Sequence, residues 1–156
     1  MEQRRTVQDV PGLLRQLERC FAAGMAMPLE ITGSSMTPFL APGRDRVLLS
    51  PVEGTLARGD IALFQRRSGA LVLHRVAACR PEGYYFTGDD QTQLEGPIAP
   101  EQLRAVARQA VRKSKWQGPG CFWWWFFRRV WLWLRPVRPA LRRLYGALRP
   151  RRANQL

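Results

Sequence analysis

The chain has 156 residues, of which 46% are hydrophobic and 24% are charged, so it can bury one core but is short for two full domains. This composition excludes a globally disordered protein. The net charge of +13 is unevenly distributed, because residues 1–101 carry 11 basic and all 12 acidic side chains, whereas residues 102–156 carry 14 basic side chains and no acid. Any interaction with nucleic acid or anionic membranes is therefore expected to involve the basic C-terminal segment.

Scarce histidine and cysteine restrict the available chemistry further. The chain has one histidine, His74, and three cysteines, Cys20, Cys79 and Cys121. These scattered residues form neither a zinc-binding pattern nor a paired disulfide framework, so we expect no metal, no cofactor and a reducing compartment. No stretch reaches the ~18 uncharged apolar residues of a transmembrane helix, so a conventional membrane span is not expected.

Residues 9–23 are predicted to form an amphipathic helix. Asp9 is a suitable N-cap, Pro11 falls in the first turn, and Gly24 is a suitable C-terminal stop. Five apolar side chains share one helical face: Leu13, Leu14, Leu17, Cys20 and Phe21. We expect this face to pack on the domain body, with a membrane or a partner protein as the alternative.

The next region changes to short β-type runs separated by glycine and proline. The candidate strands are 29–32, 46–49, 60–65, 70–79 and 84–87. Ser68-Gly69 and residues 81–83 are predicted hairpin turns, and residues 101–113 are compatible with either a helix or a strand. Short strands at this spacing predict a mostly β (α+β) domain with a small antiparallel sheet or partial barrel.

Three domain-level segments follow from these patterns. Residues 1–28 contain the N-terminal amphipathic helix, residues 29–113 the β domain, and residues 114–156 a basic, tryptophan-rich helical tail. The chemistry-bearing motifs all lie in the β domain.

Four motifs occur in order along the β domain. The first, I-T-G-S-S-M-T-P, places Ser35 before Met36, and R-G-D-I-A-L-F follows at 58–64. The others are L-V-L-H-R-V, which contains His74, and Y-Y-F-T-G-D-D, which contains Asp89. A serine hydroxyl needs a neutral base within hydrogen-bond reach, and no lysine precedes Lys113, so His74 is the only conventional base in the body. Asp89 can hold the imidazole tautomer as in a Ser-His-Asp triad.

These motifs, in this order, resemble those of the superfamily of signal peptidases and LexA-type self-cleaving repressors. The resemblance covers roughly residues 29–112, and H-R-V and T-G-D are closest to the endoplasmic-reticulum and archaeal type of signal peptidase. It implies a serine endopeptidase domain of that fold, with Ser35 as nucleophile, His74 as base and Asp89 as orienting acid. The substrate implied is a membrane-proximal extended peptide bound as an added β-strand.

The acidic member has two candidates. The endoplasmic-reticulum type has a second aspartate six residues after the first, and here Glu95 occupies that spacing. Either Asp89 or Glu95 can therefore orient His74. Signal peptidases also have a transmembrane anchor before the serine, whereas this chain has only the helix predicted at 9–23 in that place.

The nucleophile motif departs from the signal peptidase pattern at Gly33. Signal peptidases often carry a hydroxyl at this position, two residues before the serine, and it helps to bind the oxyanion. Here that role is left to backbone N–H groups, such as that of Ser35, or to the hydroxyl of Ser34 or Thr32. The alternative function is therefore a catalytically inactive peptide-binding or regulatory module of the same fold.

The tail begins with C-F-W-W-W-F-F-R-R-V-W-L-W-L at 121–134, which holds five of the six tryptophans. Tryptophan and arginine together suit a bilayer interface, and as a helix this run rises only ~21 Å against a hydrocarbon core of ~30 Å. We therefore expect an in-plane anchor on an anionic, cytoplasmic membrane face through residues 121–152. Packing on the body or a partner and binding of single-stranded nucleic acid are the alternatives, with no specific nucleic acid expected.

Overall fold

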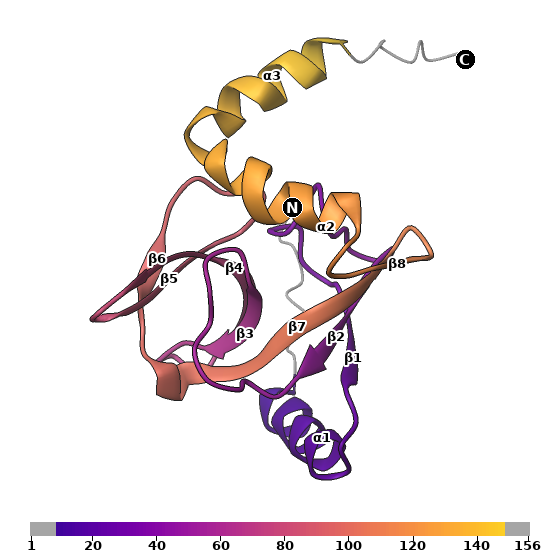
Figure 1. Ribbon diagram of the computed structural model, residues 1–156, viewed down its shortest axis with the longest axis vertical. Coiled ribbons are helices and arrows are strands. Elements are labelled where there is room, and N and C mark those ends of the chain that lie inside the picture. The colour runs from indigo at the N-terminus through magenta and orange to yellow at the C-terminus, as the bar shows by residue number, and fades with distance from the viewer. Residues whose placement is uncertain (1–8, 149–156) are drawn as a thin grey trace.

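The computed structural model describes residues 9–148, which form a mostly antiparallel β-sheet with helices at opposite ends (Figure 1). The strand order is β1-β2-β7-β3-β4-β5-β6, with β8 paired to β7. The strands are β1 Met27–Glu30, β2 Arg46–Ser50, β3 Ile61–Gln65, β4 Leu71–Arg80, β5 Gly83–Thr87, β6 Glu95–Ile98, β7 Leu103–Arg112 and β8 Lys115–Gln117. This architecture confirms the predicted α+β class. The predictions for residues 1–8 and 149–156 lie outside the described part of the chain.

The central strand is the segment that the sequence left ambiguous. Residues 100–102 form a 3₁₀ turn, and β7 then pairs with β2 and β3 on its two sides. Every pairing in the sheet is antiparallel. Four of the predicted strands, β2 to β5, begin and end within one residue of their expected bounds.

Three strands differ from the sequence prediction. β1 ends at Glu30, two residues early, because Ile31 leaves the sheet: its N–H donates to the Asp45 carbonyl at 3.0 Å, and its own carbonyl accepts from Gly43 at 3.1 Å. β6 was not predicted because glycine and proline occupy its middle. β8 was not predicted either, since it has only three residues.

Helix α1 (Val10–Ala22) forms as the apolar spacing predicts. The Asp9 side chain caps it by accepting a hydrogen bond from the Gly12 N–H at 3.1 Å. Leu17 is buried in the core, and the remaining apolar residues of that face pack around it. The domain body is thus the surface that α1 covers.

The core consists of two clusters of buried side chains. The larger one joins α1, the loop after β1, several strands and the C-terminal helices, with Leu17, Phe39, Leu63 and Phe127 among its members. The smaller one lies under β3 to β7 and contains Leu56, Ala62, Phe64, Val76, Tyr84, Phe86, Ile98 and Val106.

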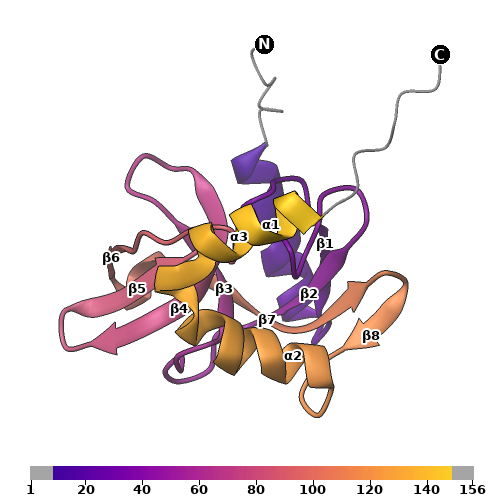
Figure 2. The same ribbon diagram turned by 90° about the horizontal axis from the view of Figure 1, so that it is seen from above.

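Helix α2 (Phe122–Phe126) packs on the body at the end opposite α1, and α3 (Arg138–Leu148) extends beyond it, away from the sheet (Figure 1). From above, α3 lies in front of α1 (Figure 2). Helix α2 continues through a π-helical turn at 127–131 and a 3₁₀ turn at 135–137 into α3. Phe127 and Leu132 are buried, whereas five rings remain exposed: Phe122, Trp123, Trp125, Trp133 and Tyr145. The segment therefore has one face in the core and another in solvent. Within residues 9–148, the helices are all too short or too polar to span a bilayer.

Candidate active site

Ser35 lies in the loop that connects β1 to β2. Met36, Phe39 and Leu40 anchor this loop, because all three side chains are buried in the larger core cluster. The preceding Gly33 and Ser34 are exposed. This combination fixes Ser35 on a rigid base and leaves the chain just before it open to a ligand.

His74 meets Ser35 from strand β4. Its side chain is 5% exposed, and its Nε2 lies 3.2 Å from the Ser35 Oγ, within hydrogen-bond distance. The Phe64 ring packs edge-on against the imidazole, with 6.3 Å between centroids. The structure thus brings together the two residues that the sequence selected as nucleophile and base. When the serine donates to Nε2, the ring proton resides on Nδ1.

The environment of His74 favours its neutral form. Burial lowers the pKa of the imidazole below its ordinary value of 6.5. The negative charge of Glu95 opposes this shift, the positive charge of Arg66 adds to it, and Asp89 opposes it as well. A neutral imidazole at pH 7 is the form that can accept a proton from serine.

The second ring nitrogen of His74 faces Glu95, at the start of β6. The His74 Nδ1 has no hydrogen-bond partner among the described residues, and the nearest carboxylate oxygen, Glu95 Oε2, lies 4.0 Å away. Arg66 holds that carboxylate in place with two hydrogen bonds of 2.5 and 3.0 Å. Glu95 is therefore positioned close to Nδ1 without being bonded to it.

Asp89 lies on the other side of the site and is bonded elsewhere. Its two carboxylate oxygens accept hydrogen bonds from Arg75 at 2.8 Å each, and both side chains are almost fully buried. Arg75 also donates to the Gly59 carbonyl at 3.0 Å. The predicted Asp89–His74 hydrogen bond is not formed: both Asp89 oxygens are bonded to Arg75, the residue next to His74, and the His74 Nδ1 has no hydrogen-bond partner among the described residues. Consecutive strand residues point to opposite faces, which separates the two pairs.

The turn that carries Asp89 contacts the nucleophile through backbone atoms. The Asp90 N–H donates to the Ser35 carbonyl at 2.9 Å. A Cβ at position 88 would lie 2.4 Å from the same carbonyl, so this close approach requires Gly88. The Gly-Asp motif thus supports the Ser35 loop, whatever the role of the Asp89 side chain.

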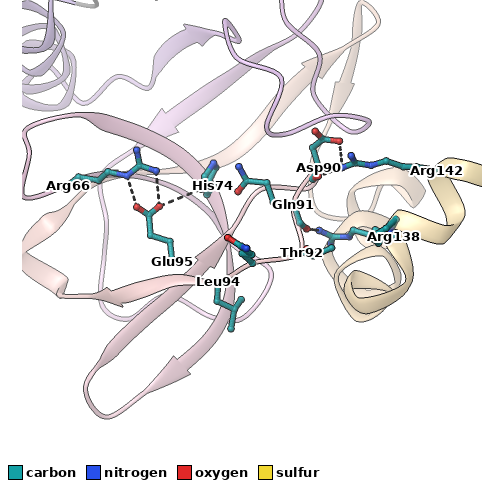
Figure 3. Close-up of a pocket in the computed structure, with 11 residues that line it drawn as sticks. Arg66, His74, Asp90, Gln91, Thr92, Leu94, Glu95, Arg138 and Arg142 are labelled. Atoms are coloured by element: carbon teal, nitrogen blue, oxygen red, sulfur yellow. Dashed lines mark hydrogen bonds and ion pairs between the residues drawn. The ribbon is translucent and has the colours of Figure 1, made fainter.

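A polar cavity of about 470 Å³ opens beside His74 (Figure 3). Arg66, His74 and Glu95 line one side, the loop 90–94 follows, and Arg138, Pro139 and Arg142 of α3 line the other side. Its volume falls within the ~300–1,000 Å³ usual for ligand sites. The C-terminal helices therefore form a wall of this cavity, which the division of the chain at residue 114 did not anticipate.

The described residues offer no grouping of three or more histidine, cysteine, aspartate or glutamate side chains suited to a metal ion. Comparisons of the chain with protein-family models, with curated proteins and with solved structures gave no significant match. The function is therefore inferred from the motifs and from the geometry around His74.

Proposed function

We propose that the chain is a serine endopeptidase that cleaves an extended peptide with Ser35 as nucleophile and His74 as general base. The observation that carries the proposal is the 3.2 Å separation between the Ser35 Oγ and the Nε2 of the single histidine. The lowered pKa of His74 supports it, since the base is neutral at physiological pH. The ordered motifs that resemble those of signal peptidases are a second, independent support.

The reaction follows from these positions. The Ser35 oxygen attacks the carbonyl carbon of the scissile peptide bond while its proton passes to the His74 Nε2. When the C–N bond breaks, the imidazolium returns that proton to the leaving amine, and the acyl group stays on Ser35. Water then attacks the ester, again with His74 as base, and releases the free acid and the serine.

Glu95 is the carboxylate that the geometry favours as the orienting group. The Nδ1–H of His74 faces it across 4.0 Å, and a positive imidazolium attracts the carboxylate more strongly than the neutral ring does. The oxyanion is bound by backbone N–H groups or a neighbouring hydroxyl of the exposed 32–34 segment. Strand β1 leads directly into this loop and pairs only with β2 among the described strands, so its free edge suits an extended substrate.

The decisive experiment is labelling of the full-length protein with a serine-reactive fluorophosphonate, followed by mass spectrometry. Wild type is expected to react at Ser35, and Ser35→Ala and His74→Gln to lose nearly all labelling and all peptide cleavage. Ser68→Ala is the matched control, because it removes an exposed serine of the β3–β4 turn and leaves the pair and the Ser35 loop intact. Equal labelling of wild type and Ser35→Ala contradicts the proposal.

A peptide-binding module without catalysis is the second candidate. Two observations favour it: Gly33 replaces the oxyanion hydroxyl, and the His74 Nδ1 has no hydrogen-bond partner among the described residues. A peptide that binds the wild-type protein and remains intact, together with an unreactive Ser35, supports this candidate over the peptidase.

We further propose that the C-terminal helices dock on an anionic, cytoplasmic membrane face and hold the site near membrane-bound substrates. Exposed Trp125 and Trp133 lie on the solvent side of this segment, with Arg129 and Arg143 nearby in the chain. Aromatic rings insert at headgroup depth, and arginines pair with lipid phosphates. The buried Phe127 fixes the segment on the body, which leaves the outer rings free for lipid.

Vesicle flotation tests the membrane proposal. Trp125→Ser combined with Trp133→Ser is expected to lower binding to phosphatidylserine vesicles by about tenfold or more, since the inserted aromatic area is lost. Trp116→Ser on β8 is the control, because that ring is equally exposed but lies outside the helices. High salt should leave wild type on vesicles, whereas release by salt together with binding to single-stranded nucleic acid contradicts the proposal.

A further inference from the structure

Arg138, the first residue of α3, is a fully buried cation next to the candidate active site. Its side chain is 0% exposed. One guanidinium nitrogen donates to the carbonyls of Gly88 and Gln91 at 3.1 and 2.6 Å, and another donates to the Trp131 carbonyl at 2.9 Å. The guanidinium also lies 5.3 Å from the centre of the Trp131 ring. The Nε has no hydrogen-bond partner among the described residues, so the cost of burying this charge is offset only through the two terminal nitrogens and the ring contact.

All four consecutive carbonyls of the turn 88–91 accept hydrogen bonds from the C-terminal helices. Arg138 takes the first and the last, the Trp131 Nε1–H donates to the Asp89 carbonyl at 2.8 Å, and Arg142 donates to the Asp90 carbonyl. Tail and turn are separated by about forty to fifty residues in the sequence. An arrangement in which every carbonyl of a turn is bonded to one distant segment fixes that turn in a single position.

The same turn holds the nucleophile from its other side. The Asp90 N–H donates to the Ser35 carbonyl at 2.9 Å, and Gly88 allows the closest approach of the two backbones. A continuous set of contacts therefore runs from Arg138 through the turn to Ser35. Residues 90–94, which comprise the end of the turn and the three residues after it, form one wall of the cavity beside His74 (Figure 3).

The charges around Arg138 are unequal. Burial lowers the pKa of Arg138 to about 10; the negative charge of Asp89 opposes this shift, and the positive charges of Arg75, Arg135 and Arg142 add to it. The guanidinium remains charged at pH 7. A hydrophobic side chain at position 138 would avoid the cost of burying a positive charge among other arginines, but it could not donate hydrogen bonds to the turn.

We infer that Arg138 is a positioning residue for catalysis: by bonding the turn 88–91, it sets the distance between the Ser35 Oγ and the His74 Nε2. The C-terminal helices are then an integral part of the active site as well as a surface element. This inference rests on the proposed peptidase function, and its effect is on placement, since Arg138 does not touch the reacting atoms. Displacement of a reacting group by ~1 Å can cost about 100-fold in rate.

The test uses full-length Arg138→Gln, with Arg108→Gln as control because Arg108 is an exposed arginine of β7 with no role in the site. In protein confirmed as folded by circular dichroism, the rate of Ser35 labelling is expected to fall by about tenfold or more. Methylguanidinium added to Arg138→Ala should restore part of the rate, which a general loss of stability would not allow. Labelling of Arg138→Gln within twofold of wild type overturns the inference.

A second variant covers the case in which Arg138→Gln does not fold. Trp131→Phe keeps an aromatic ring but deletes the N–H bonded to the Asp89 carbonyl. Hydrogen–deuterium exchange at the Asp90 amide is expected to quicken in this variant, with slower labelling of Ser35. If wild-type Ser35 proves unreactive, the proposed function fails, and hydrogen–deuterium exchange alone then tests whether the C-terminal helices hold the turn 88–91 against Ser35. An unchanged exchange rate of the Asp90 amide in Trp131→Phe overturns the inference.

Discussion

The turn that carries Asp89 and the cavity wall that carries Glu95 flank the same pair, Ser35 and His74, yet their polar groups are hydrogen-bonded to different degrees. On the turn side, Asp89 is fully buried, and Arg75 occupies both of its oxygens. On the cavity side, Glu95 is partly exposed, and the facing His74 Nδ1 has no partner within the described part of the chain.

This difference separates structural from chemical roles. A buried ion pair is costly to disturb, because removal of one partner leaves the other as an uncompensated buried charge. A carboxylate held 4.0 Å from an unpaired nitrogen can shorten that distance when the imidazolium forms. We therefore propose that the Asp89 side contributes to stability and the Glu95 side to the proposed catalysis.

Asp89→Asn is expected to have the largest effect, and on stability. It leaves Arg75 as an uncompensated buried charge, which costs about 3–5 kcal/mol in the free energy of unfolding. Urea denaturation measures this loss. Asp90→Asn is the control, because its pair with Arg142 is solvent-exposed and is worth at most about 1 kcal/mol. A stable Asp89→Asn protein with a rate reduced by ~10⁴ would instead make Asp89 the triad acid.

Glu95→Gln is expected to act on rate more than on stability. Loss of the carboxylate should slow Ser35 labelling by about 10- to 100-fold, less than the ~10⁴ of a directly bonded triad acid. Its pair with Arg66 is partly exposed, so the free energy of unfolding should change by about 1 kcal/mol or less. Arg66→Met breaks the same ion pair and keeps the carboxylate. If both variants lose the same activity, the ion pair matters and Glu95 has no separate role.

The sequence was sufficient for features that depend on local patterns. Helix α1 follows from the spacing of its apolar residues and the Asp9 cap, and β2 to β5 follow from short apolar runs between turn residues. His74 could be selected as base because it is the single histidine and no lysine precedes Lys113. Ser35 was selected among several serines by the motif that resembles the nucleophile motif of signal peptidases. Neither selection needs knowledge of the fold.

Contacts between segments that are distant in the sequence could not be predicted from these local patterns. Arg75 bonds Asp89 and Arg138 bonds the turn 88–91, but neither contact has a periodic signal, since each joins segments from different elements. One usable signal was present. His74 and Arg75 are neighbours in a strand, so their side chains face opposite ways, and an acid held by the arginine is separated from the imidazole.

The tail shows the same limit. The tryptophans of residues 121–134 predict a surface anchor, yet Phe127 and Leu132 of the same segment are buried in the structure. A helix that is apolar on all sides can pack with one face and expose the other, and composition does not reveal which residues lie on which face.

Gly33→Ser tests the position two residues before Ser35, where signal peptidases often carry an oxyanion-binding hydroxyl, and a moderate gain in rate is expected. A Cβ at position 33 meets no atom within 4 Å, so a serine fits without displacement. Its hydroxyl can donate to the oxyanion and is expected to raise the rate about tenfold, a part of the ~100–1,000-fold that a native donor contributes. Gly33→Ala is the control. If alanine gives the same gain, backbone stiffening is responsible, and the hydroxyl has no role.

Arg66→Met is expected to have the smallest effect at pH 7 and a clear effect on the pH profile. Burial and Arg66 both lower the pKa of His74, so the wild-type labelling rate should rise with pH through a midpoint below 6.5. Removal of Arg66 deletes a positive charge and leaves the opposing charge of Glu95 in place, and both raise the pKa of the imidazole. The midpoint should therefore move to higher pH, with a change in labelling rate of about twofold or less at pH 7.

Arg67→Met, an exposed neighbour in the same hairpin, is the control and should leave the midpoint unchanged. The same shift predicts that folded wild type binds fewer protons at His74 than the unfolded chain, so this contribution to stability is lost as pH falls below 6.5. A midpoint that stays fixed or falls in Arg66→Met would show that the charges on the cavity side do not control the base.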